Sequence, residues 1–142
     1  MLAVIDTGVL VSGVFWRHEP HRVLLAWKCG LLTPVVSPPI FGEYERVLED
    51  VRRIEGFTTD LSPWLEALRI AAMWVSPSPL ARKLCRDPSD DKFIEAALAS
   101  GARTVIARDH DLTILKKPYG IEILTPRVWL SRLPRSQRRI VH

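Results

Sequence analysis

The chain has 142 residues, of which 47% are hydrophobic and 25% are charged, and its formal net charge is +4. This length suits one domain with its own core, and neither half is long enough for a second one. No run reaches the ~18–20 apolar residues of a membrane helix, and the apolar start lacks the basic residues of a signal peptide, so we expect a soluble, cytoplasmic protein with no membrane partner.

Short apolar runs alternate with amphipathic segments along the chain. The runs with the composition of strands buried on both faces of a sheet are residues 2–5, 35–37, 104–107 and 121–124. The segments whose apolar residues recur every three to four positions, as in helices, are residues 20–29, 39–54, 62–73 and 89–100. The Pro- and Ser-rich residues 74–79 are expected to form a loop within the domain. This alternation predicts an α/β fold with a parallel sheet.

The end of the chain is rich in arginine. The last eleven residues contain Arg132, Arg135, Arg138 and Arg139. We therefore expect a single domain over residues 1–131 and a basic C-terminal tail over residues 132–142. Such a tail is either a solvated terminus or an arm that contacts phosphates or a partner, and the residues leave both interpretations open.

Acidic residues follow the expected strands. Asp6 ends the first strand and Asp109 lies just past the third, while Glu43 and Asp91 fall in the first turns of two helices. Ligands of an open parallel sheet gather at the carboxyl ends of its strands. We therefore expect these four carboxylates to converge at one edge of the sheet and to form the catalytic and metal-binding set.

Two of these assignments have neighbours that compete for the same role. In residues 87–91 one acid is expected to cap the helix, and Asp87 or Asp90 fits that position, which leaves Asp91 as the functional choice. Asp109 and Asp111 likewise compete for one role, and Asp109 is preferred. Glu43 has a structural alternative as a first-turn acid favoured by the helix dipole.

Carboxylates that converge repel one another unless a cation joins them. Mg²⁺ or Mn²⁺ prefers oxygen ligands, and the sequence has neither a histidine pattern for zinc nor a glycine-rich phosphate loop. We expect Asp6, Asp91 and Asp109 to position one ion and Glu43 to hold a second ion or the attacking water.

The order of these motifs resembles that of PIN-domain proteins. The resemblance spans residues 2–130 and is carried by residues 4–12, 37–48, 87–97 and 107–112. It is greatest to the toxins of PIN-type toxin–antitoxin pairs. The resemblance implies a three-layer α/β/α sandwich with a central, mainly parallel sheet. It also implies a Mg²⁺- or Mn²⁺-dependent endoribonuclease, an RNA substrate, a homodimer and inhibition by a small antitoxin protein.

Position by position, Asp6, Glu43, Asp91 and Asp109 match the family's acidic residues, and Thr7 matches its small hydroxyl residue. Gly8 departs from the family, which usually has a polar residue there. Loss of such a supporting side chain typically costs about 10–100-fold in metal affinity or activity. The alternative is therefore a weakened or inactive PIN-like module that binds RNA or a partner. An aspartyl-phosphate enzyme is a further alternative, although the usual second acid is missing at position 8.

Overall fold

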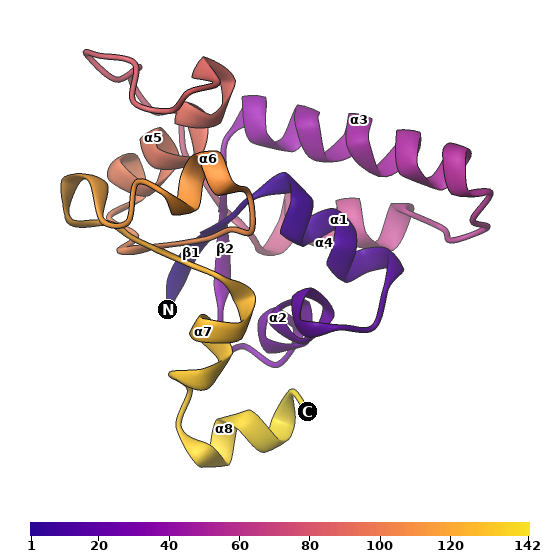
Figure 1. Ribbon diagram of the computed structural model, residues 1–142. Helices are drawn as coiled ribbons and strands as arrows, with labels where there is room; N and C mark the ends of the chain where they lie inside the picture. The colour runs from indigo at the N-terminus through magenta and orange to yellow at the C-terminus, as the bar shows by residue number, and fades with distance from the viewer.

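A five-stranded, all-parallel sheet forms the centre of the protein in the computed structural model, which describes residues 1–142 (Figure 1). The strands lie in the order β3-β2-β1-β4-β5. Their bounds are β1 (Leu2–Ile5), β2 (Thr33–Val36), β3 (Met73–Trp74), β4 (Thr104–Ile106) and β5 (Glu122–Leu124). The predicted α/β fold is confirmed.

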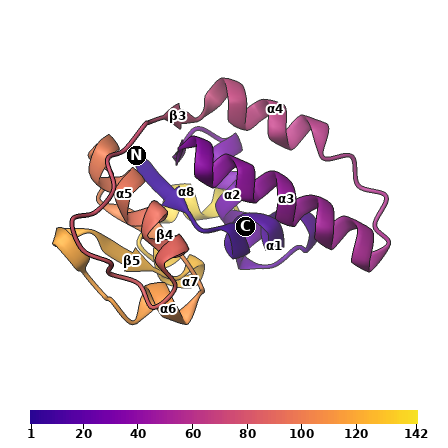
Figure 2. The same ribbon diagram turned by 90° about the horizontal axis from the view of Figure 1, so that it is seen from above.

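Eight helices and two short 3₁₀ turns accompany the strands, and the last two helices follow β5. The helices are α1 (Thr7–Phe15), α2 (Glu19–Lys28), α3 (Pro38–Glu55), α4 (Ser62–Ala71), α5 (Asp91–Ser100), α6 (His110–Thr113), α7 (Pro126–Ser131) and α8 (Arg135–Ile140). The 3₁₀ turns are η1 (Pro88–Asp90) and η2 (Pro118–Gly120). Viewed from above, α3 and α4 lie on one side of β1 and α5 lies on the other, where it packs on β1, β2 and β4 (Figure 2).

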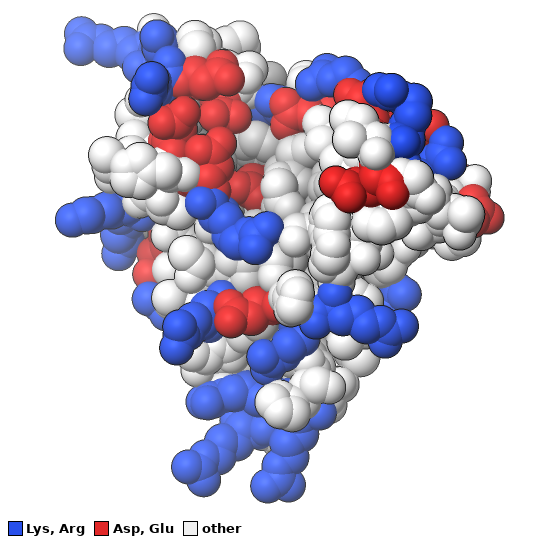
Figure 3. Space-filling model, turned by 45° about the vertical axis from the view of Figure 1, so that its right-hand side comes forward, with Lys and Arg blue, Asp and Glu red and all other residues white.

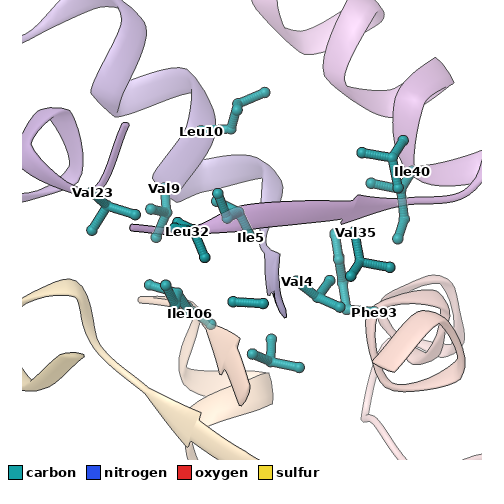
Figure 4. Packing of buried hydrophobic residues seen from close by; sticks show 14 of the residues in the cluster. Val4, Ile5, Val9, Leu10, Val23, Leu32, Val35, Ile40, Phe93 and Ile106 are labelled. Atoms are coloured by element: carbon teal, nitrogen blue, oxygen red, sulfur yellow. The ribbon is translucent and has the colours of Figure 1, made fainter. Parts of the chain in front are cut away.

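The core lies on both faces of the central strands. It is a single cluster of 35 buried residues. Figure 4 shows Val9 of α1 and Phe93 of α5 on opposite sides of the strands that carry Val4 and Val35. Burial of β1 and β2 on both faces explains why these strands are continuous apolar runs rather than alternating ones.

Helix α1 was not among the predicted helices. Its sequence is mostly apolar, with no charged residue and no polar face to reveal a helical period. Asp6 caps its first turn, and Gly13 lets α2 approach closely, since a Cβ at that position would lie 2.8 Å from the carbonyl oxygen of Pro20. Met73, expected at the end of a helix, instead begins the edge strand β3.

The arginine-rich end of the chain is folded against the domain. Residues 135–140 form α8, and Val141 after it is fully buried. Arg22 of α2 donates its Nε–H to the carbonyl oxygen of Val141 at 3.0 Å. No helix of the protein has the length and apolar character needed to cross a membrane.

Candidate metal centre

A pocket of about 320 Å³ opens at the carboxyl ends of β1 and β4. Three of the four expected acids line it, one from each of three separate segments. The lining residues are Asp6, Thr7, Gly8, Glu43, Asp90, Phe93, Arg108, Asp109 and Leu112. Acidic side chains gather at this end of the molecule, whereas Lys and Arg dominate the opposite end (Figure 3).

Asp6 is the most deeply buried acid of the pocket, with 3% of its surface exposed. One carboxylate oxygen accepts the Val9 amide at 2.8 Å, and the other accepts the amides of Arg108 at 3.2 Å and Asp109 at 3.4 Å. Burial raises the pKa of Asp6 to about 6, against the lowering effect of these hydrogen bonds, and the nearby charge of Asp109 raises it further. The amides fix the carboxylate and join β1 to the loop after β4.

Glu43 is positioned by a well-defined start of α3. Buried Ser37 caps this helix by accepting the Ile40 amide at 3.5 Å. The Glu43 Oε1 atom accepts a hydrogen bond from Lys92 Nζ at 3.0 Å, and its Oε2 atom accepts one from the Thr7 hydroxyl. The Glu43 charge is therefore partly neutralised by a lysine that the sequence analysis did not single out.

Lys92 is largely buried beside the pocket, with 12% of its side chain exposed. Its ammonium group also donates to the Ser89 carbonyl oxygen at 2.6 Å, which holds it in place between η1 and α3. The residue lies in the first turn of α5, directly after the Asp90–Asp91 pair. A fixed positive charge therefore lies within a group of carboxylates.

Asp90, Asp109 and Asp111 form the part of the site best suited to a cation. Their carboxylate oxygens lie within 4.8 Å of one another. Burial raises the pKa of Asp90 to about 6, and the charges of Asp109 and Asp87 add to this effect. Oxygen-only donors at this spacing fit a hard divalent cation such as Mg²⁺ or Mn²⁺, which would relieve their repulsion.

Asp91 is directed away from the pocket, although it was expected to take part in it. It is 6% exposed, and its two carboxylate oxygens accept the backbone amides of Leu84 at 2.9 Å and Cys85 at 2.6 Å. Successive residues of a helix point in directions roughly 100° apart, so Asp90 and Asp91 point to different surroundings. The structure places Asp90 in the pocket instead, while Asp87 caps η1. The role of Asp91 as a ligand stays a prediction.

Tyr44 holds the backbone next to Asp6 in place. Its side chain is fully buried, and its hydroxyl donates to the Ile5 carbonyl oxygen, next to Asp6. Burial raises the pKa of Tyr44, and the charges of Asp6 and Glu43 raise it further. Tyr44 therefore links α3 to the end of β1 as a neutral phenol. The sequence signal was only an apolar position on a helix, which does not reveal this contact.

Gly8 leaves open space at the rim of the pocket. A Cβ built at this position would lie 3.8 Å from Asp6 Oδ1, which is an ordinary van der Waals distance. The backbone therefore has room for a side chain here, and the glycine is not required by packing.

A comparison with protein families identifies the family of the chain. A family model described as a PIN domain matches residues 3–111. The chain belongs to the PIN domain family. The match contains every acid of the pocket and ends within α6, so α7 and α8 of this PIN domain lie outside it. Comparison with curated proteins and with solved structures gives no match. PIN domains are generally metal-dependent nucleases, and the acidic cluster of this one could bind a metal ion.

Proposed function

We propose that this PIN domain is a Mg²⁺- or Mn²⁺-dependent endoribonuclease. The observation that carries the proposal is the meeting of carboxylates from β1, α3, η1 and the β4 loop around one pocket. Burial, and to a smaller extent the neighbouring carboxylates, raises the pKa values of Asp6 and Asp90, so the ionised group is unfavourable by itself. The presence of this group of carboxylates therefore indicates a ligand that carries positive charge.

The proposed ligand set is Asp6, Asp90 and Asp109, with Asp111 close enough to assist. A bound divalent ion supplies Lewis-acid stabilisation of a phosphodiester and lowers the pKa of water. Asp6 is the most rigid of these ligands, because three backbone amides hold its carboxylate. Rigid ligands of this kind lose little entropy when they bind.

The other polar residues of the pocket have roles towards the RNA. Arg108 brings positive charge to the acidic pocket, where its guanidinium group offers hydrogen bonds to phosphate oxygens. Lys92 lies beside the pocket, and its ammonium group holds Glu43 and the Ser89 carbonyl oxygen. Glu43, held by Thr7 and Lys92, is placed to accept a proton from an attacking water. Phe93 and Leu112 form an apolar wall that limits the access of bulk water.

The biological role that we propose is that of the toxin in a toxin–antitoxin pair, acting as a homodimer and inhibited by a small antitoxin protein. The support is the ordered set of motifs that resembles such toxins. Growth of a bacterial host during induced expression tests this role. We expect arrest with the native chain and normal growth with Asp109→Asn. Normal growth with both chains, at equal soluble protein levels, contradicts the toxin assignment.

A second candidate function is RNA binding without cleavage. Gly8 favours it, because this position near Asp6 offers no side chain to donate a hydrogen bond to a metal-bound water. This alternative predicts that RNA binds equally well with and without divalent ions and is never cut. Cleavage that requires Mn²⁺ and disappears in Asp109→Asn excludes it.

The test of the metal site compares two adjacent acids. We expect calorimetric Mn²⁺ binding and RNA cleavage to be abolished in Asp90→Asn and retained in Asp91→Asn. Asp50→Asn is a matched control, because this exposed acid of α3 pairs only with Arg53. Loss of Mn²⁺ binding in Asp91→Asn but not in Asp90→Asn reverses the assignment. Retention in both variants contradicts a metal site at this end of α5.

A further inference from the structure

A second charged surface lies at the end of the molecule opposite the acidic pocket (Figure 3). We call it the basic surface. It consists of two adjoining hollows of about 470 and 260 Å³ that share Arg22 and Arg138. The remaining positively charged or titratable basic residues that line them are Arg127, Arg135, Arg139 and His142. Glu19 is their only acid, and the chain has no Asp or Glu after residue 122.

The arginines of the basic surface have no carboxylate partners. None of the five takes part in an ion pair, whereas Arg52, Arg53 and Arg69 on α3 and α4 all do. Like charges that gather without counter-charges disfavour the folded state. An anionic ligand would remove this cost.

The basic surface is held by tertiary contacts and is not a loose tail. Val141 and Leu133 are buried on either side of α8. Arg22 donates to the Val141 carbonyl oxygen at 3.0 Å, and Arg138 donates to the Leu133 carbonyl oxygen at 2.6 Å. Arg22 Nη2 also lies 3.4 Å from His142 Nδ1. The remaining N–H groups of the two guanidinium groups are left for a ligand.

The lining of the larger hollow indicates the class of ligand. It contains four arginines and a histidine and no hydrophobic residue. Protein partners are normally held by buried aromatic and apolar anchors, which this hollow lacks. The planar guanidinium group matches phosphate oxygens in a bidentate manner. Several such groups side by side fit a polymer of phosphates better than one small anion.

We propose that the basic surface binds the phosphate backbone of the RNA at a distance from the cleavage pocket. This inference rests on the proposed ribonuclease function and adds a second contact region for its substrate. A compact domain of this size is on the order of 35 Å across, so only a long RNA reaches both ends. Apart from Glu19 and Arg22, the residues that line the surface lie outside the matched PIN region.

The test uses two triple variants with the same loss of charge. Arg127→Gln, Arg135→Gln and Arg139→Gln together remove exposed arginines of the basic surface and leave the hydrogen-bonded Arg22 and Arg138 in place. In the control, Arg52→Gln, Arg53→Gln and Arg69→Gln remove three arginines of α3 and α4. Both sets carry Asp109→Asn, and binding of an RNA of about 40 nucleotides, long enough to span the domain, is measured in EDTA by fluorescence anisotropy.

We expect the basic-surface variant to bind this RNA at least about tenfold more weakly, and the slope of log K against log salt to fall by about 2. The control is expected to change by less than about threefold. Equal losses in the two variants overturn the proposal, and so does the absence of any loss. Binding of a polyglutamate peptide at least as tightly as RNA also overturns it, in favour of an acidic protein partner.

Cleavage separates this proposal from the nuclease function. With Asp109 intact, we expect the basic-surface variant to lose kcat/KM on the long RNA and to keep it on a hexanucleotide. If no chain cuts RNA but the binding difference persists, the ribonuclease proposal fails and the basic surface stands. If all chains cut long RNA equally well, the basic surface is not a substrate contact.

Discussion

The buried Asp6 carboxylate predicts how the stability of the metal-free protein depends on pH. Its pKa in the folded protein is raised from 3.8 to about 6, chiefly by burial. The folded state therefore binds more protons than the unfolded state between these values. The stability that protonated Asp6 contributes is complete below about pH 3.8 and is lost as the pH rises through about 6.

The size of the change in stability follows from the shift in the pKa of Asp6. A change from 3.8 to about 6 corresponds to about 3 kcal/mol in total. By linkage, about 2 kcal/mol of this falls between about pH 4.5 and pH 7.5. Asp90, whose pKa is also raised to about 6, titrates in the same range and acts in the same direction. The comparison with Asp6→Asn isolates the contribution of Asp6.

Urea unfolding in EDTA, followed by tryptophan fluorescence, measures this contribution. The free energy of unfolding of the native chain minus that of Asp6→Asn is expected to fall by about 2 kcal/mol between about pH 4.5 and pH 7.5. The substitution also alters the hydrogen bonds to Asp6, which adds an offset that does not vary with pH. Mn²⁺ at 100 times its dissociation constant is expected to restore about 2.7 kcal/mol to the native chain at pH 7.5, and nothing to Asp6→Asn.

Two results would refute this reasoning. A difference that does not change with pH would mean that burial of Asp6 does not hinder its ionisation. A difference that increases with pH would mean that the hydrogen bonds from the backbone amides outweigh burial, and that Asp6 is stable as a carboxylate without any cation.

Three further predictions concern residues around the pocket. Asp91→Asn is expected to lower the free energy of unfolding by about 1–3 kcal/mol, since two backbone amides lose a charged acceptor, while calorimetric Mn²⁺ affinity stays within about threefold. Gly8→Asn is expected to raise Mn²⁺ affinity up to about tenfold by supporting Asp6, and an unchanged affinity would show that this support is not needed. Lys92→Met removes the cation beside Glu43, so calorimetry is expected to find one Mn²⁺ in the native chain and a second in the variant. A count of one in both chains contradicts the idea that Lys92 takes the place of an ion.

The local sequence was sufficient for the parts of the site that depend on strand ends. An apolar run buried on both faces reads as a parallel strand without knowledge of its neighbours, and Asp6 and Asp109 each follow such a run. All parallel strands point the same way, so acids at their carboxyl ends meet at one edge. This is why the proximity of Asp6 and Asp109 could be expected from the residues, whereas the pairing of β1 with β4 is seen only in the structure.

The local sequence does not show which residues at the start of α5 face the pocket. Asp90 and Asp91 differ by one position, and the tertiary contacts of α5 decide which faces the pocket and which binds the amides of the 84–85 loop. Lys92 reaches Glu43, which is 49 residues away in the chain, only because α3 and α5 contact each other in the folded protein. If the helix were rotated by one residue, Asp90 and Asp91 would exchange their roles, although the sequence would be the same.

At the arginine-rich end of the chain too, the sequence shows the charge and the tertiary structure decides its position. Its charge is a property of the residues alone, and composition predicted a basic segment over residues 132–142. That α8 folds back onto α2, with Val141 buried and Arg22 beside Arg138, follows from long-range packing that no local pattern encodes. Strand ends and net charge are short-range properties and so are visible in the sequence, whereas helix phase and the meeting of distant side chains exist only once the chain has packed.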